Sequence, residues 1–139
     1  MRLELSRKTD LALKAVTFLA ASSGEPVSGR ALAEALDTTP HFLPQVMKPL
    51  VDNGYVGSSP GPTGGYRLLV GLGDTTLLEV IEAIEGPFDL GRCISTGKPC
   101  PAQESCALHI PWTRAKNAVL DELGAVTLDV MEPNSKPGG

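Results

Sequence analysis

The stretch TTPHFLPQVMKPLVDNGYVGSSPGPTGGYRLLV, residues 38–70, decides the fold that we expect. Its first half carries apolar residues at helical spacing and ends at Gly54, a common stop signal for a helix. Its second half predicts two short strands, 55–58 and 66–70, which the Pro- and Gly-rich segment 60–65 joins as a hairpin tip. The stretch therefore predicts a helix followed directly by a β-hairpin.

The start of this helix has two readings. Thr39 is a suitable N-cap and Pro40 a suitable first-turn residue, so the helix can open there; alternatively, Pro44 opens it. Under either reading Pro49 lies in the helix interior, where a proline removes a hydrogen bond and costs about 3 kcal/mol. We therefore expect a bent or shortened helix.

Two more helices are predicted before this stretch, because apolar residues recur at helical spacing over 8–21 and Ser28 can cap a short helix after it. Three helices and a hairpin, within residues 1–72, follow the order of a winged helix-turn-helix. That fold places its third helix in the major groove of DNA and its hairpin on the backbone or in the minor groove. A small α+β domain without a role on DNA is the plainer alternative.

The second part of the chain, residues 73–131, is predicted to be helical at both ends. Thr76 and Glu79 form a capping box ahead of an apolar stripe that ends at Gly86-Pro87. Residues 87–105 read as irregular, and a last amphipathic helix lies around Trp112 to Leu123. The end, 132–139, is rich in Pro and Gly and is expected to be a flexible tail. The fold class is thus mostly α with a small β-hairpin.

Composition excludes several classes of protein. The chain has 139 residues, of which 42 % are hydrophobic and 20 % charged, as in an ordinary soluble domain. It lacks an apolar run long enough to cross a membrane and a signal-peptide core, so we expect a cytoplasmic protein without a membrane partner. It also lacks a Ser/His/Asp set and a phosphate-binding loop, and we expect no enzyme activity. The net charge of −4 is concentrated in the second half, and the first half is nearly neutral.

The three cysteines lie close together, at Cys93, Cys100 and Cys106, and His109 follows the last of them. An odd count in a reducing compartment argues against a disulfide framework. Thiolates suit zinc, copper(I) or an iron–sulfur cluster, and the wide gaps fit a polynuclear cluster better than the tight pairs of zinc modules. Three thiolates leave one position for a weaker ligand, which makes a cluster easier to attack and suits a sensor. Zinc and three inert cysteines remain alternatives.

Over nearly its whole length, from Met1 to Leu128, this order resembles the family of iron–sulfur winged-helix transcription regulators of the IscR and NsrR type. The most specific parts of the resemblance are the hairpin 61–66, the segment Ile84-Glu85-Gly86 and the three-cysteine loop. The resemblance implies a homodimer in which each subunit offers one winged helix to half of an imperfect palindrome in double-stranded DNA. It also implies that the last helix is the dimerisation helix and that a cluster lies near the dimer interface.

Two types within that family differ in the fourth cluster ligand, and this chain carries both signatures. Cys106-Ala107-Leu108-His109 is similar to the type in which a histidine completes a 2Fe–2S cluster. The segment 9–14, which contains Asp10, is similar to the nitric-oxide type, in which an aspartate of the partner subunit reaches a 4Fe–4S cluster. The longer local match favours Asp10, with His109 close behind.

The resemblance also implies a DNA-contacting set on the third helix and the hairpin. Gln can pair with adenine, and a lysine at position 48 is expected to meet phosphate or guanine. The chain departs from the family pattern at Pro44, where a polar base-reading residue is common, at Pro60, where an arginine is usual, and in the six-residue first cysteine gap. The candidate DNA-binding residues are Thr39, His41, Gln45, Lys48, Gly64, Gly65, Tyr66 and Arg67.

These observations predict a DNA-binding transcription regulator, with repression the favoured direction. Its iron–sulfur cluster would sense nitric oxide, redox state or iron–sulfur supply. An iron–sulfur electron-transfer protein without DNA binding, and a zinc-stabilised DNA-binding module, are the competing interpretations.

Overall fold

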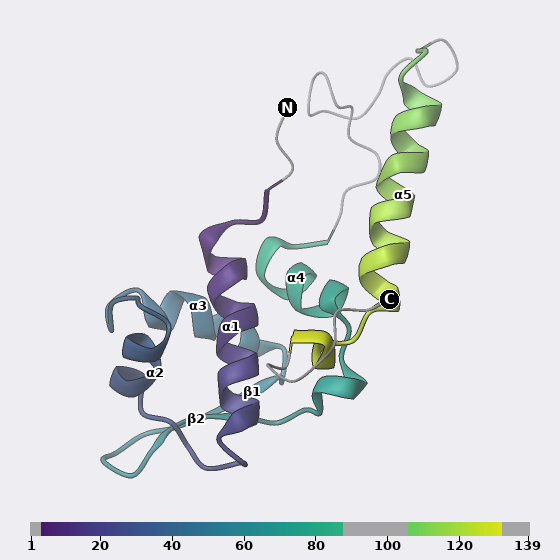
Figure 1. The fold of residues 1–139 in the computed structure, drawn as a ribbon. Helices are drawn as coiled ribbons and strands as arrows, with labels where there is room; N and C mark the ends of the chain where they lie inside the picture. Colours follow the sequence, from purple (N-terminus) through teal and green to yellow (C-terminus); the bar gives the residue numbers. More distant parts are fainter. Residues whose placement is uncertain (1–3, 88–105, 132–139) are drawn as a thin grey trace.

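The computed structural model describes residues 4–87 and 106–131, and Figure 1 shows their arrangement. The predicted fold class, mostly α with one antiparallel β-hairpin, is confirmed. Cys93, Cys100 and the predicted flexible tail 132–139 lie outside the described residues. In chain order the elements are the helices and strands α1 (Arg7–Ala21), α2 (Gly29–Ala35), α3 (Leu43–Asp52), β1 (Val56–Ser59) and β2 (Gly65–Leu68), the 3-10 turn η1 (Leu72–Asp74), the helices α4 (Leu77–Glu85) and α5 (His109–Ala125), and the 3-10 turn η2 (Leu128–Met131).

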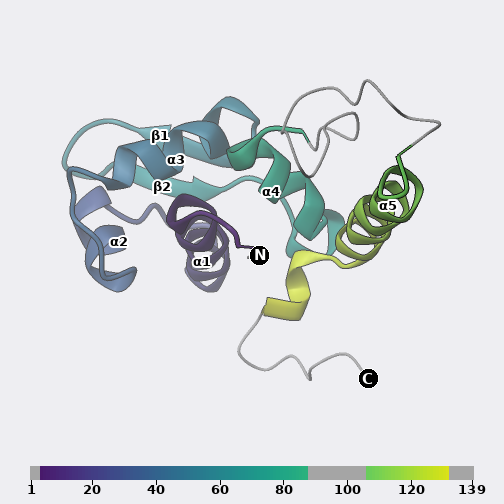
Figure 2. The ribbon, with the colours of Figure 1, turned by 90° about the horizontal axis from the view of Figure 1, so that it is seen from above.

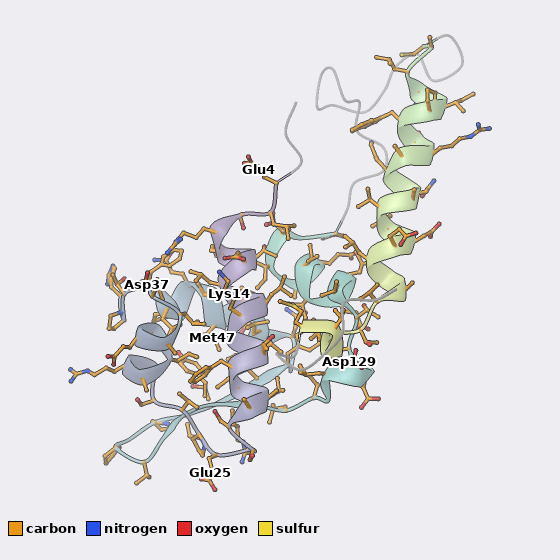
Figure 3. All side chains as sticks on the ribbon, viewed as in Figure 1. Glu4, Lys14, Glu25, Asp37, Met47 and Asp129 are labelled. Atoms are coloured by element: carbon orange, nitrogen blue, oxygen red, sulfur yellow. The ribbon has the colours of Figure 1, made fainter. Side chains whose placement is uncertain are left out.

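One buried cluster of side chains joins the first three helices to α4 and η2. Met47 of α3 is fully buried and lies in the interior of Figure 3. Val80 of α4 and Leu128 of η2 belong to the same cluster, with exposed fractions of 0 % and 1 %. Residues 1–72 and 73–131 therefore share a core, and their division into a DNA-binding region and a cluster and dimer region stays a prediction of function. None of the described helices is long and apolar enough to span a membrane.

Short polar side chains start three of the helices, as the sequence predicts for two of them. The Ser28 hydroxyl accepts a hydrogen bond from the Ala31 amide at 3.1 Å and caps α2. At α4, the Thr76 hydroxyl accepts from the Glu79 amide at 3.2 Å, and the Glu79 carboxylate accepts from the Thr76 amide at 2.8 Å. The predicted capping box is thereby confirmed. Ser6 caps α1 in the same manner.

The third helix begins later than one of its two readings predicts. It starts at Leu43 with Pro44 in its first turn, so the alternative start is confirmed and the start at Pro40 is wrong. The Thr39 hydroxyl instead accepts a hydrogen bond from the Phe42 amide at 3.0 Å and closes a turn ahead of the helix. The helix is shortened at this end, and it continues through Pro49 to Asp52.

The hairpin is fixed against the start of α2. Its register pairs Val56 with Leu68, and Tyr66 also forms an isolated bridge with Val27, which precedes α2. The two residues exchange both backbone hydrogen bonds, each 2.8 Å long. Gly65 has φ +144°, and a Cβ there would lie 2.2 Å from the Val27 carbonyl oxygen. Only glycine fits this approach, because any side chain would push β2 away from α2.

A carboxylate links the end of α4 to the start of α1. Glu85 Oε1 accepts hydrogen bonds from the Ser6 amide at 2.9 Å and from the Thr9 hydroxyl at 2.6 Å. These hydrogen bonds, those of Ser6 first, hold the pKa of Glu85 below its ordinary value. The negative charge lies at the N-terminal end of α1, where the helix dipole also favours it.

Helix α5 lies on the outer side of α4. In Figures 1 and 2, α4 lies between it and α1, and its N-terminal end projects away from the body. None of the residues of α5 is buried, and Ile110 and Val119 are 59 % and 37 % exposed. Its C-terminal end is anchored, because the Leu77 amide donates to the Val126 carbonyl at 2.9 Å. Leu120 and Leu123 are half-buried, so the uncovered apolar side chains of α5 within the described residues include Ile110 and Val119.

We expect Gly65→Ala to destabilise the protein by about 1–3 kcal/mol, because the new Cβ would collide with the Val27 carbonyl at a φ that alanine rarely adopts. Gly73→Ala is the matched control, since a Cβ at Gly73 would approach no atom closer than 3.9 Å. The measurement is the free energy of unfolding in urea. Equal stability of the two variants would contradict the role assigned to this close approach.

Candidate nucleic-acid interface and cluster site

Helix α3 has a buried face and a solvent face. Val46 and Met47 are buried, whereas Gln45 and Lys48 are exposed and lie three residues apart. Residues at this spacing are neighbours on a helix surface, so both side chains can enter one groove of DNA. Lys48 Nζ forms an ion pair with Asp52 at 3.0 Å, and both side chains are more than half exposed. Such an exposed pair is weak and can be exchanged for a phosphate.

The turn before α3 holds two more candidates, with different roles. His41 is exposed in this turn. Thr39 is exposed too, but its hydroxyl already accepts a hydrogen bond from the Phe42 amide. It therefore shapes the turn that presents α3. An open hollow of about 530 Å³ lies beside this turn and is lined by Arg7, Asp37, Thr38, Thr39 and Phe42.

Three of the four hairpin candidates have structural roles. A Cβ on Gly64 would lie 2.2 Å from the Ser59 carbonyl oxygen, and Gly65 is equally constrained by Val27. Tyr66 is half-buried, with its ring 3.8 Å from where a Cβ of Gly29 would lie. Arg67 is exposed on β2 opposite Gly57, so its side chain is the one available to DNA.

The structure brings the two groups of DNA candidates to one side of the molecule. Figures 1 and 2 place α2, α3 and the hairpin together, with α5 on the opposite side. Arg30, the second residue of α2, is exposed and was not singled out in the sequence, and Gly29 before it lies next to the Tyr66 ring of β2. The available signal was a cation two residues after the α2 cap Ser28. This side therefore has the layout of a winged-helix DNA-binding face.

The candidate cluster ligands that are described lie in two places. Cys106 is a half-buried free thiol ahead of α5, and His109 is the first residue of that helix. The His109 amide donates to the Cys106 carbonyl at 3.2 Å, so one turn holds both residues. Asp10 is exposed on the first turn of α1, where it forms an ion pair with Lys14 at 2.9 Å.

Asp10 and Cys106 belong to elements that lie on opposite sides of α4. In both views α4 lies between α1, which carries Asp10, and α5, which Cys106 precedes in the chain. Within residues 4–87 and 106–131 there is no group of three or more His, Cys, Asp or Glu side chains that could hold a metal ion. Cys93 and Cys100 lie outside those ranges.

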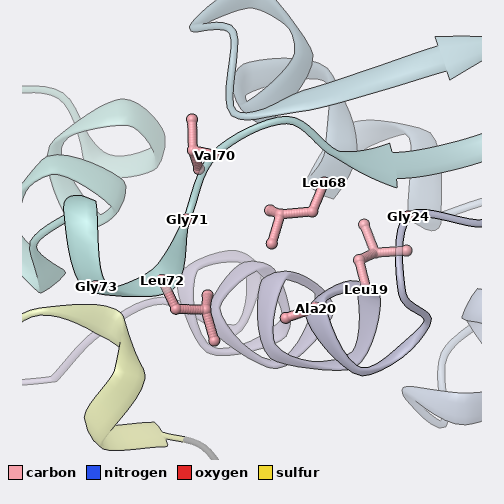
Figure 4. Close-up of a pocket in the computed structure, with 8 residues that line it drawn as sticks. All are labelled: Leu19, Ala20, Gly24, Leu68, Val70, Gly71, Leu72 and Gly73. Carbon is pink, nitrogen blue, oxygen red and sulfur yellow. The ribbon is translucent and has the colours of Figure 1, made fainter.

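A second hollow, of about 300 Å³, has no chemistry of its own. Figure 4 shows that it lies between the end of α1 and the segment after β2. Its lining is apolar or glycine, without a titratable side chain: Leu19, Ala20, Gly24, Leu68, Val70, Gly71, Leu72 and Gly73.

Known proteins match this chain over almost its full length. The family model Rrf2, described as iron-dependent transcriptional regulators, matches residues 5–133. The HTH-type transcriptional regulator IscR of Xenorhabdus nematophila is 30 % identical over 136 residues, which cover 96 % of this chain and 82 % of that protein.

Two solved structures are similar in fold. CymR, the global cysteine regulator of B. subtilis, is 28 % identical with a TM-score of 0.73, and the match covers 97 % of this chain and 100 % of that one. IscR of T. potens is 27 % identical with a TM-score of 0.68, and the match covers 93 % and 85 %. These relatives are transcriptional regulators and not enzymes. The winged-helix face and these matches together show that the chain belongs to the Rrf2 family of DNA-binding transcriptional regulators.

Proposed function

We propose that this regulator holds an iron–sulfur cluster through Cys93, Cys100 and Cys106, and that the state of the cluster sets its affinity for DNA. The observation that carries the proposal is the free Cys106 thiol in the turn that begins α5, with His109 beside it. The family's description as iron-dependent and the similarity to IscR support the same assignment. Repression is the proposed direction, and the cytoplasm, where the DNA partner lies, is the proposed location.

The donor set fits a cluster chemically. Three thiolates are soft ligands for iron, and a carboxylate or imidazole supplies a weaker fourth donor. A cluster held in this manner supplies a redox-active group that nitric oxide or an oxidant can attack. The chain's contribution is to fix Cys106 at the start of a helix whose other end is anchored beside α4.

Asp10 and His109 are competing fourth ligands. His109 shares a turn with Cys106 and would complete a 2Fe–2S cluster within one subunit. Asp10 is 54 % exposed and has to leave Lys14 to reach a 4Fe–4S cluster across a dimer. Because that ion pair is solvent-exposed, breaking it costs little.

The proposal includes a homodimer through α5. A 17-residue helix without a buried residue is unusual in a monomer, and its exposed Ile110 and Val119 favour burial against a second copy. Two DNA-binding faces related by a two-fold axis match an imperfect palindrome with half-sites about 34 Å apart. Cluster loss would shift the population between dimers that fit this spacing and dimers that do not.

The first test identifies the ligands. In protein purified without oxygen, each of Cys93→Ala, Cys100→Ala and Cys106→Ala should lose iron and sulfide, because two thiolates cannot hold the cluster. Asp10→Ala or His109→Ala, whichever removes the fourth ligand, should change the visible spectrum. Asp52→Ala, another exposed acid in an i,i+4 lysine pair, and His41→Ala are the matched controls. Stoichiometric zinc without sulfide would contradict the cluster and favour the interpretation as a zinc-stabilised module.

The second test concerns the dimer. Val119→Glu should shift the protein from dimer to monomer in sedimentation, since burying an unpaired carboxylate at an interface costs several kcal/mol, on the order of 5. Val130→Glu is the control, because Val130 is also 37 % exposed but lies in η2. An unchanged dimer in Val119→Glu would place the interface elsewhere.

The third test joins the cluster to DNA. A palindromic duplex selected from a random pool should bind cluster-loaded and cluster-free protein with affinities that differ by about tenfold or more at fixed salt. Gln45→Ala should lose about 1–3 kcal/mol of discrimination at particular base pairs, whereas Lys48→Ala should weaken binding to all sequences. Equal affinities of the two forms would remove cluster control while leaving DNA binding intact.

A further inference from the structure

We propose that Arg30, in the first turn of α2, binds a DNA backbone phosphate next to the hairpin and adds a cation beside the hairpin tip, which has none. This inference deepens the DNA-binding function of the chain and does not depend on the cluster. It assigns a role to a residue outside α3 and β2, the elements that carry most of the DNA candidates.

The hairpin is poor in charge. Between Asn53 and Tyr66 the sequence contains neither lysine nor arginine, and position 60 is a proline. Arg67 on β2 is the one cation of the hairpin, and its other donors to a phosphate are amides and the hydroxyls of Ser58, Ser59 and Thr63. Affinity for DNA comes mostly from cations at the phosphates, so a second cation from a neighbouring element would strengthen the contact of this hairpin with DNA.

Arg30 is available for this role. Its residue is exposed, and Glu34 follows it by one helical turn. Nevertheless, no ion pair joins Arg30 to Glu34 or to any other residue of the part of the chain that the structure describes. Lys14 and Lys48, by contrast, are paired with carboxylates at 2.9 and 3.0 Å. A phosphate at Arg30 would therefore displace no protein partner.

The backbone holds Arg30 at a fixed place relative to the hairpin. Val27 and Tyr66 exchange two 2.8 Å hydrogen bonds, and a Cβ on Gly65 would lie 2.9 Å from the Ser28 amide nitrogen. The Ser28 hydroxyl then caps α2 through the Ala31 amide at 3.1 Å. Arg30 thus follows by three residues the point, Val27, at which β2 is fixed to the segment before α2.

The position also suits the geometry of DNA binding. The first helix of a helix-turn-helix crosses the DNA backbone while the next helix enters the major groove. Arg30 belongs to that first helix, and the hairpin lies beside it on the same side of the molecule. A guanidinium can bind two oxygens of one phosphate, which fixes the register of the protein without reading bases.

The test compares Arg30→Gln with Lys14→Gln, which removes the same charge from an exposed site on α1. The probes are a fluorescent duplex selected from a random pool by the wild-type protein and a duplex of scrambled sequence. Arg30→Gln should weaken binding to both by about tenfold at low salt, with their affinity ratio unchanged. The negative slope of log affinity against log salt should become shallower by about 0.9 per subunit. Arg30→Lys should retain the slope, and Lys14→Gln should match wild type.

Two results would overturn the assignment. A salt slope in Arg30→Gln equal to that in Lys14→Gln would show that Arg30 binds no phosphate. A loss confined to the selected duplex would show that Arg30 reads a base or orients α3. The slope does not depend on the fraction of active protein, so a partly folded variant still decides the question. Measurements with cluster-loaded and cluster-free protein separate this result from cluster control, since the Arg30 slope change is expected in both forms.

Discussion

Two backbone hydrogen bonds between Val27 and Tyr66 fix the position of the hairpin relative to α2, on which the DNA-binding face depends. They join the segment before α2 to the second hairpin strand, and each is 2.8 Å long. A two-stranded ribbon by itself is marginally stable in water, and these bonds hold the hairpin in place together with the burial of Val56 in the core. With them, the hairpin and the helix-turn-helix form one surface. Gly65 is the residue that permits the contact, because a Cβ would occupy the place of the Val27 carbonyl.

A second contact joins the parts of the molecule that the proposed function has to couple. Glu85, the last residue of α4, accepts hydrogen bonds from Ser6 and Thr9 at the start of α1. Chain order places Glu85 shortly before Cys93, and Asp10 directly follows Thr9. The same contact therefore joins the residues that precede the proposed cluster loop in the chain to the helix that carries one of its candidate ligands. Below the ordinary pKa of a glutamate this link weakens, because the hydrogen bonds favour the carboxylate over the acid.

Some of the candidate residues shape the predicted DNA-binding face, and others carry exposed side chains that can contact DNA. Gly64, Gly65 and Tyr66 were predicted as DNA-binding residues from a motif, and the structure gives each a packing role in the hairpin. Thr39 was predicted to open α3, and its hydroxyl closes the turn before it. Exposed polar side chains remain at Gln45, Lys48, Arg67 and Arg30, and the elements that carry them lie on one side of the molecule. Motif residues at a binding face thus include those that shape the face as well as those that contact DNA.

The sequence alone determined what depends on neighbours within a few positions. The Ser28 cap, the capping box of Thr76 and Glu79, and the hairpin follow from hydrogen bonds and turn preferences over three or four residues. The cluster ligands, three thiols and a weaker fourth donor, stay a prediction from spacing and resemblance. Tertiary structure decided that α5 has no buried residue. It also decided that Tyr66 holds the hairpin to Val27 and that Glu85 caps a helix 76 residues or more away in the chain. These two contacts join distant parts of the chain, and only folding around the shared core brings their atoms within hydrogen-bonding distance.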